Sequence, residues 1–89
     1  MSFVSQIMRK ASIVERSDAA PVEKAEKLEQ LVSEADTIRE RMQSSFMRLS
    51  ANEMETLGPG RMKEIAQLDE TKLKLKEKVL LFLGKNRSA

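Results

Sequence analysis

The sequence contains no cysteine, no histidine, no tryptophan and no tyrosine. Without cysteine the chain can form neither a disulfide framework nor a thiolate metal site, and without histidine it lacks the commonest zinc ligand and the commonest general base. Catalysis requires a positioned acid, base, nucleophile or metal ion. We therefore expect a protein that is not an enzyme, binds no metal or other cofactor, and takes no small-molecule substrate.

Long hydrophobic runs are also missing. The longest run, residues 79–83, has five residues, whereas a helix that spans a bilayer needs about 20. The N-terminal segment lacks the apolar core of a secretory signal, although the absence of acidic residues before Glu15 and the presence of Arg9 and Lys10 are weakly typical of leader sequences. We expect a cytoplasmic protein, with export through a leader-dependent secretion system as the alternative.

Glycine and proline are scarce, with three and two residues, and the only aromatic residues are three phenylalanines. Charged residues make up 34% of the chain and hydrophobic residues 40%. A mixture rich in Glu, Lys, Leu, Met and Arg favours helix, and the apolar residues are too many and too regularly spaced for a disordered chain. The sequence predicts an all-α protein in which residues 1–89 form a single helical domain.

The length of the chain limits the core that it can build. A chain of 89 residues buries only a modest share of its surface when it folds. Small proteins compensate for this with disulfides, metal ions or association with another chain. Since the composition excludes the first and disfavours the second, we expect a protein partner, which includes a second copy of the same chain.

Residues 1–17 have the pattern of a short amphipathic helix. Apolar side chains recur at helical spacing, at Phe3, Val4, Ile7, Met8, Ala11 and Val14. Residues 17–20 interrupt this pattern. Pro21 suits the first turn of a helix and disfavours a helical residue before it, so we expect the next helix to begin there.

Residues 21–57 are predicted to form a long helix. Its apolar stripe follows heptad spacing and consists of Leu28, Leu31, Ala35, Ile38, Met42, Ser45, Leu49 and Asn52, with Val32 and Phe46 widening it. Ser50 and Glu53 have the spacing of a capping box, in which each side chain accepts a hydrogen bond from the backbone N–H of the other residue. A break at Ser50 is therefore the alternative to an uninterrupted helix.

Gly58, Pro59 and Gly60 form the strongest interruption in the chain. Glycine supplies the conformation that closes a helix, and proline disfavours its continuation. We therefore predict a turn at residues 58–60 and a second long helix over residues 61–83, followed by a tail at residues 84–89. The second helix has Ile65, Leu68, Leu75, Val79 and Phe82 on one face.

Two long helices joined by a three-residue turn should form an antiparallel helical hairpin of coiled-coil type. Charge supports the pairing, because residues 21–57 carry five basic and eight acidic side chains whereas residues 58–89 carry eight basic and four acidic ones. Each exposed pair contributes under about 1 kcal/mol, so charge favours the hairpin only modestly.

The two predicted arms differ in length, which leaves residues 22–32 uncovered. The N-terminal helix has the right length to fold over this stretch, and its apolar stripe would then approach Leu80 and Phe82. The sequence predicts an elongated three-helix arrangement with a thin core.

The apolar surface of this arrangement exceeds what its core can bury, which predicts a partner that completes it. Met42, Met47, Met54 and Met62 lie around the predicted turn, and methionine suits both adaptable binding surfaces and loosely packed cores. We predict a non-enzymatic protein–protein interaction module (a small chaperone, adaptor or inhibitor) that binds through apolar helical faces, with self-association as its simplest form. The predicted partner-binding residues are Phe3, Ile7, Met8, Leu80, Phe82 and Leu83 at one end and Phe46 and Met54 at the other.

Two other functions stand as alternatives. The basic C-terminal helix, with Lys72, Lys74, Lys76 and Lys78, could serve a nucleic-acid-associated protein, but residues two apart point in different directions on a helix and the net charge is only +2. Residues 1–16 are the basis for a peripheral membrane protein or a secreted effector. Their basic face is sparse, so packing onto the other helices is favoured over membrane binding.

Overall fold

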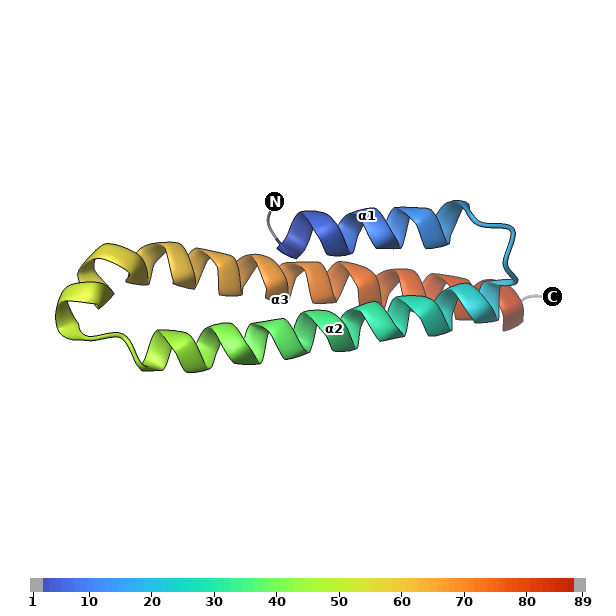
Figure 1. The fold of residues 1–89 in the computed structure, drawn as a ribbon. Coiled ribbons are helices and arrows are strands. Elements are labelled where there is room, and N and C mark those ends of the chain that lie inside the picture. The colour runs from blue at the N-terminus through green and yellow to red at the C-terminus, as the bar shows by residue number, and fades with distance from the viewer. Residues whose placement is uncertain (1–2, 88–89) are drawn as a thin grey trace.

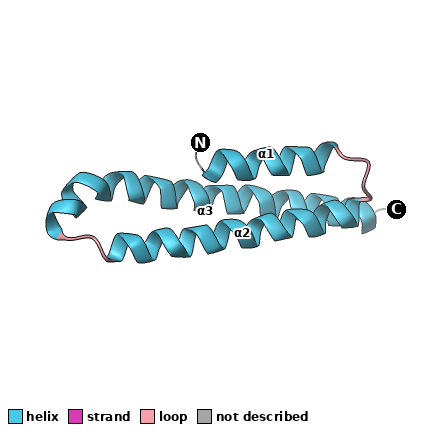
Figure 2. Cartoon of the chain, in the orientation of Figure 1, coloured by secondary structure: helices cyan, strands magenta, loops and turns pink. Residues whose placement is uncertain are grey.

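The chain folds into three helices packed along a common axis. The structure, a computed structural model, describes residues 3–87, with only the backbone for residues 85–87; α1 spans Phe3–Arg16, α2 spans Pro21–Met47 and α3 spans Ala51–Arg87. No strand occurs within the described residues, so the predicted all-α class is confirmed. The molecule is elongated, with extents of 56 × 22 × 15 Å (Figures 1 and 2).

The first connection is close to the prediction. Ser17 ends α1, because its backbone N–H and its hydroxyl both donate to the carbonyl oxygen of Val14, at 3.2 and 2.7 Å. Ala20 is extended, and Pro21 occupies the first turn of α2, where a missing N–H costs nothing. The helix predicted over residues 1–17 is thus observed over Phe3–Arg16, one residue shorter at its carboxyl end, and residues 1–2 lie outside the described residues.

The second connection lies ten residues earlier than predicted. α2 ends at Met47 instead of residue 57, and the chain turns through residues 48–50. The capping box starts α3: the Ser50 N–H donates to Glu53 Oε1 at 3.1 Å, and the Glu53 N–H donates to Ser50 Oγ at 3.3 Å. The N–H of Ser50 also holds the pKa of the Glu53 carboxyl below its ordinary value of 4.5. Of the two alternatives, the break at Ser50 is therefore correct.

The turn predicted at residues 58–60 is wrong, because Pro59 lies inside α3. None of the glycines has a positive φ, so neither Gly58 nor Gly60 closes a helix. Pro59 removes one backbone hydrogen bond and α3 bends near its start (Figure 1), as helices do at proline. The packing of α3 against α2 offsets this cost. The inward-facing positions of α3 keep one heptad phase through the segment: Gly58 and Leu68 are buried, and Met54, Arg61 and Ile65 are half-buried.

Gly58 is buried in the seam between α2 and α3 for a steric reason. A Cβ atom at this position would lie 3.0 Å from Met54 Sδ and 3.8 Å from Phe46 Cε2. The missing side chain thus leaves room for the Met54 thioether, whereas the Phe46 ring would be only in ordinary van der Waals contact with an added Cβ atom. The C-terminal prediction also needs correction, because α3 continues through Gly84 to Arg87 instead of ending at residue 83.

The core lies mainly between α2 and α3, which pack side by side (Figure 1). Its members are Ala25, Leu28, Leu31, Ala35 and Met42 of α2, Leu68, Leu75 and Val79 of α3, and Ile7 and Ala11 of α1, with Thr71 as the buried polar residue. The Thr71 hydroxyl donates to the carbonyl oxygen of Gln67 at 2.8 Å, so its burial leaves no unsatisfied donor.

α1 folds back over the pair, but it sits differently from the prediction. Its first turns lie beside the middle of α2, where Phe3 and Ile7 line a hollow of about 420 Å³ with Thr37 and Ile38. Its last turn, not its first, lies near Phe82. The expectation that Phe3, Ile7 and Met8 approach Leu80 and Phe82 is therefore wrong, because the short connection at residues 17–20 places the end of α1 beside the start of α2.

Candidate interaction site

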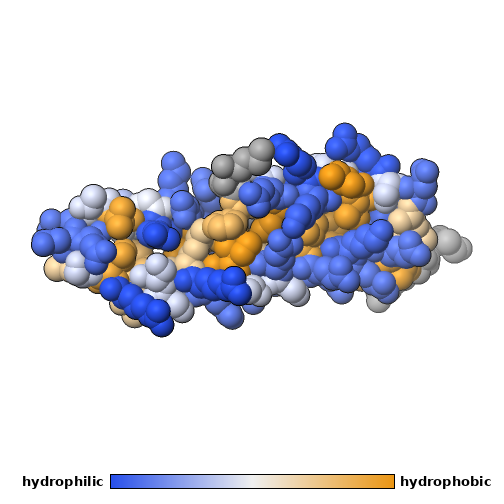
Figure 3. All heavy atoms as spheres, viewed as in Figure 1, coloured by the Kyte–Doolittle hydropathy of each residue, from blue (hydrophilic) through white to orange (hydrophobic). Residues whose placement is uncertain are grey.

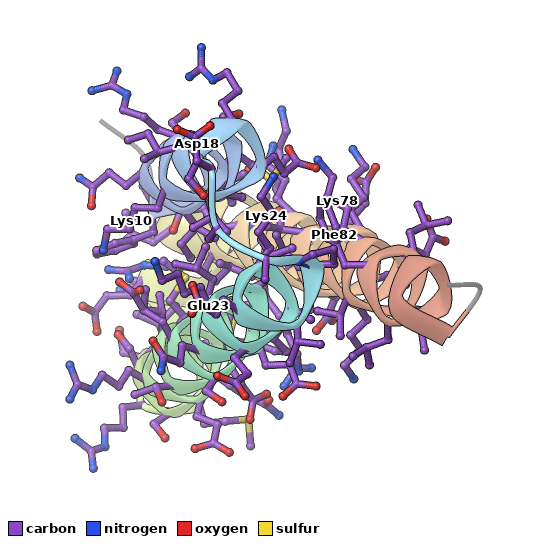
Figure 4. The ribbon with its side chains drawn as sticks, turned by 90° about the vertical axis from the view of Figure 1, so that its right-hand side faces the viewer. Lys10, Asp18, Glu23, Lys24, Lys78 and Phe82 are labelled. Atoms are coloured by element: carbon purple, nitrogen blue, oxygen red, sulfur yellow. The ribbon has the colours of Figure 1, made fainter. Side chains whose placement is uncertain are left out.

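The three helices are joined at one end by two lysines. Lys24 Nζ donates to the carbonyl oxygen of Glu15, at the last turn of α1, at 2.9 Å and lies 5.5 Å from the centre of the Phe82 ring. Lys78 Nζ lies 2.9 Å from Glu15 Oε1. Figure 4, which looks at this end of the molecule, shows Lys24, Lys78 and Phe82 gathered where the helices meet. A cation at the carboxyl end of a helix is favourable, so these contacts hold α1 in place.

The opposite face of the α2–α3 pair carries an open groove of about 480 Å³. It is lined by Glu29, Val32 and Ser33 of α2 and by Lys76, Val79, Leu80 and Leu83 of α3. Lys76 and Leu80 each lie two residues from Lys78, which points toward α1, so they project from nearly the opposite side of α3. α1 therefore leaves this groove uncovered. We call it the Leu80 groove.

The floor of the Leu80 groove is apolar and exposed. Leu80 is 68% exposed, while Val32 and Leu83 are half-buried and Val79 is buried. Leu81 is as exposed as its neighbour, at 65%, but does not line the groove. A leucine that stays in water next to other apolar side chains loses about 1.5–3 kcal/mol of burial that a partner could supply. Such a groove is typical of a surface that receives a helix.

Ion pairs close the groove toward the 48–50 turn. Lys72 of α3 donates a hydrogen bond to the carboxylate of Asp36 of α2, and this bond and the lysine charge lower the pKa of the Asp36 carboxyl below its ordinary value of 3.8. One turn further, Arg39 Nε approaches the Asp69 carboxylate at ion-pair distance, without the alignment of a hydrogen bond. The apolar opening is thus confined to the end of the pair that lies away from the turn.

The walls of the groove carry opposite charges. Glu29 stands on the α2 wall and Lys76 on the α3 wall. Neither side chain takes part in an ion pair within the described part of the chain, although Lys76 is near enough to Asp36 to contribute to its lowered pKa. The groove therefore offers one free charge of each sign beside an apolar floor.

The structure separates the predicted partner-binding residues. Leu80 and Leu83 share the groove, whereas Phe82 is half-buried on another side of α3, beside Lys24. Phe3 is 49% exposed and Met8 is half-buried, both on α1, and Ile7 belongs to the core at 1% exposure. Phe46 and Met54 are half-buried near Gly58 at the far end, inside the α2–α3 seam.

The methionines do not form one surface. Met42 is in the core and Met54 is half-buried, whereas Met47 and Met62 are 74% and 61% exposed. Across the face drawn in Figure 3, apolar side chains form a band along the long axis, bordered by polar residues. Of the two roles that the sequence left open for these four methionines, core packing applies to Met42, while Met47 and Met62 are exposed at separate positions.

The groove residues that sequence reasoning did not assign to the site are Glu29, Val32, Ser33, Lys76 and Val79. The sequence does contain a pattern for the two charged residues, which is a seven-residue spacing. Glu29 and Asp36 are seven residues apart on α2, and Asp69 and Lys76 are seven apart on α3. Residues seven apart share a helix face. The pattern could be recognised only with the correct pairing of the two helices, which the misplaced turn concealed.

Three of the four lysines proposed for nucleic-acid binding are held by carboxylates. Lys72 pairs with Asp36, Lys78 with Glu15, and Lys74 lies 3.3 Å from Glu70 Oε1. Within the described helices there is no stretch long and apolar enough to cross a membrane, and among the same residues no group of three acidic, histidine or cysteine side chains is arranged to hold a metal ion.

In comparisons with known proteins, no family model, no curated sequence and no solved structure matches this chain.

Proposed function

We propose that this protein is a non-enzymatic protein–protein interaction module, whose α2 and α3 act as an antiparallel, coiled-coil-like hairpin and whose binding surface is the Leu80 groove. The observation that carries the proposal is the exposure of Leu80, at 68%, beside Val32, Val79 and Leu83. A chaperone, adaptor or inhibitor of this kind would receive a partner helix in the groove.

The chemistry of the groove defines the helix that fits it. An apolar stripe with residues at i, i+3, i+4 and i+7 would cover the floor. A basic side chain on one flank would meet Glu29, and an acidic one on the other flank would meet Lys76. Because Lys72, Lys74 and Lys78 are held in ion pairs, protein binding is favoured over binding to nucleic acid.

Site-specific photo-cross-linking tests this proposal with a matched pair of positions. A photoreactive amino acid is placed at position 80 or at position 81 of the full chain in the cell that makes it, and the adducts are identified by mass spectrometry. Leu80 and Leu81 have nearly equal exposure, so random encounters label both equally. We expect a defined protein adduct at position 80 that position 81 does not give.

Binding of the purified partner then gives the energetic test. Leu80→Glu places a charge on the apolar floor and should weaken binding tenfold or more, in line with a central interface residue whose loss costs about 1.4–2 kcal/mol or more. Leu81→Glu should leave the affinity within about a factor of two. Equal effects of the two substitutions, or equal adducts at the two positions, contradict the assignment of the groove.

A further inference from the structure

We propose that the occupant of the Leu80 groove is a second copy of this chain, and that two copies pack groove to groove about a twofold axis parallel to the long axis of the α2–α3 pair. This inference rests on the proposed function, because it names the partner of the same groove. It assigns a defined geometry, in which α2 of each copy lies over α3 of the other.

The exposed area of the chain supports an interface of the required size. The chain exposes 6327 Å², whereas a compact monomer of 10.1 kDa exposes about 5,300 Å². The excess, about 1,000 Å², is close to the ~800 Å² that each partner buries in an interface of standard size. An elongated chain with this much extra surface gains stability when a second chain covers one of its long faces.

The charges on the groove walls select the symmetry. One possible twofold axis runs across the helices, in the plane of the interface, and places α2 of one copy over α2 of the other. This axis brings the two Glu29 side chains together and also brings the two Lys76 side chains together. A twofold axis parallel to the helices places α2 over α3. Glu29 of each copy then faces Lys76 of the other copy, so two like-charge contacts are replaced by two attractive ones.

The apolar floor and the position of α1 are both compatible with this arrangement. Two copies of Val32, Val79, Leu80 and Leu83 would form a common apolar layer among four helices. α1 packs against the other face of the pair, so neither copy has to release it. The Asp36–Lys72 ion pair ends the layer toward the 48–50 turn, where the surface becomes polar.

The oligomeric state of the full-length chain gives the first test. Light scattering of the wild-type protein should show a dimer, Leu80→Glu should shift it to monomer, and Leu81→Glu should leave it dimeric, with circular dichroism showing that all three proteins keep their helix content. A wild-type protein that stays monomeric at the highest accessible concentration overturns the proposal.

An exchange of charges tests the geometry. Glu29→Lys and Lys76→Glu, each alone, place two like-charge contacts in the proposed dimer and should raise its dissociation constant about tenfold at low salt. A mixture of the two single variants should form a heterodimer, because all charges on one copy then face opposite charges on the other. The double variant should dimerise as the wild type does.

The alternative symmetry makes a different forecast for the same proteins. With α2 over α2, the wild-type dimer already contains two like-charge contacts and each single variant also contains two, so neither single substitution would weaken dimerisation. A mixture of the wild type and the double variant would then form a heterodimer. The proposed axis disfavours this heterodimer, because it places Glu29 over the glutamate introduced at position 76 and Lys76 over the lysine introduced at position 29. That result overturns the proposed axis. If the wild-type chain is monomeric but position 80 cross-links to a different protein, the groove keeps its proposed function and the second copy is excluded as its partner. If position 80 gives no adduct that position 81 lacks, the Leu80 groove is not the binding surface, and the proposed function is contradicted as well.

Discussion

At the residue scale, ion pairs specify which faces of the helices meet. Four of the five ion pairs within the described residues join different helices: Lys10–Glu34, Arg39–Asp69, Lys72–Asp36 and Lys78–Glu15. The partners keep much of their contact with water, so each pair contributes little to the free energy of folding. Their larger effect is on register, because a shift of α3 along α2 would leave these charges unpaired or facing like charges.

The Asp36–Lys72 pair predicts a dependence of stability on pH. The pKa of Asp36 is lowered in the folded protein, first by the hydrogen bond from Lys72 and then by its charge. A lowered carboxyl pKa means that the stabilisation is fully present above the unfolded-state pKa, about 3.8, and is lost as the pH falls through the lower folded-state pKa. Asp36→Asn should therefore lower the free energy of unfolding at pH 7 and have little effect near pH 2.

Urea denaturation of the wild type and the variant at both pH values measures this difference. Asp18→Asn is the matched control, because Asp18 is exposed in the connection between α1 and α2 and belongs to none of the ion pairs among the described residues. An effect of Asp36→Asn that is equally large at pH 2 would show that the carboxylate charge is not its origin.

At the element scale, the course of α3 through Pro59 shows tertiary packing overriding local preference. A proline in a helix interior costs about 3 kcal/mol, and each glycine up to about 1 kcal/mol. The heptad phase that joins Met54, Gly58 and Leu68 keeps the apolar side chains of α3 on the face that meets α2. A turn at residues 58–60 would have removed the first turns of α3 from this interface.

Replacement of Gly60 by alanine tests whether this segment is helical. Gly60 has no positive φ, and a Cβ atom there would meet nothing within 4 Å. In a helix, Gly60→Ala should thus raise the free energy of unfolding by about 0.5–1 kcal/mol, through higher helix propensity and a less flexible unfolded chain. Urea denaturation measures the change, and Gly84→Ala, where an added Cβ atom would likewise meet nothing within 4 Å, is the reference. A loss of stability with Gly60→Ala would instead indicate a turn that needs a glycine.

Sequence reasoning predicted the fold class and the start of α2 but misplaced the second connection. Pro21 could be interpreted locally, since proline at the first turn of a helix breaks no hydrogen bond. Pro59 could not, because its cost is weighed against contacts with Phe46 and other residues that are distant in sequence. The binding site shows the same division between local and long-range signals. Leu80 and Leu83 could be assigned from the apolar run alone, whereas Glu29 and Lys76 could be assigned only once the pairing of α2 with α3 was known.

At the scale of the whole molecule, the three helices contribute unequally. α2 and α3 share most of the core, and only Ile7 and Ala11 of α1 are buried in it. The polar contacts of Lys24 and Lys78 hold the carboxyl end of α1, whereas nearer its amino end the contacts are the buried Ile7 and the Lys10–Glu34 ion pair. α1 is thus a peripheral layer on a two-helix scaffold whose other face carries the Leu80 groove.

Ala11→Leu should release this layer. Ala11 is 0% exposed where α1 meets the other helices, and three additional carbon atoms there overpack the contact at a cost of about 1–3 kcal/mol. Because α2 and α3 retain their own core, amide hydrogens of residues 3–16 should exchange much faster while those of α2 and α3 stay protected. Ile13→Ala, at a position that is 59% exposed, should change neither the exchange of residues 3–16 nor that of α2 and α3.

Hydrogen exchange with mass spectrometry measures the protection of each helix separately. Equal loss of protection in all three helices would mean that they unfold as one unit and that α1 is required for the scaffold. Selective loss would mean that the Leu80 groove, on the opposite face, keeps its shape without α1.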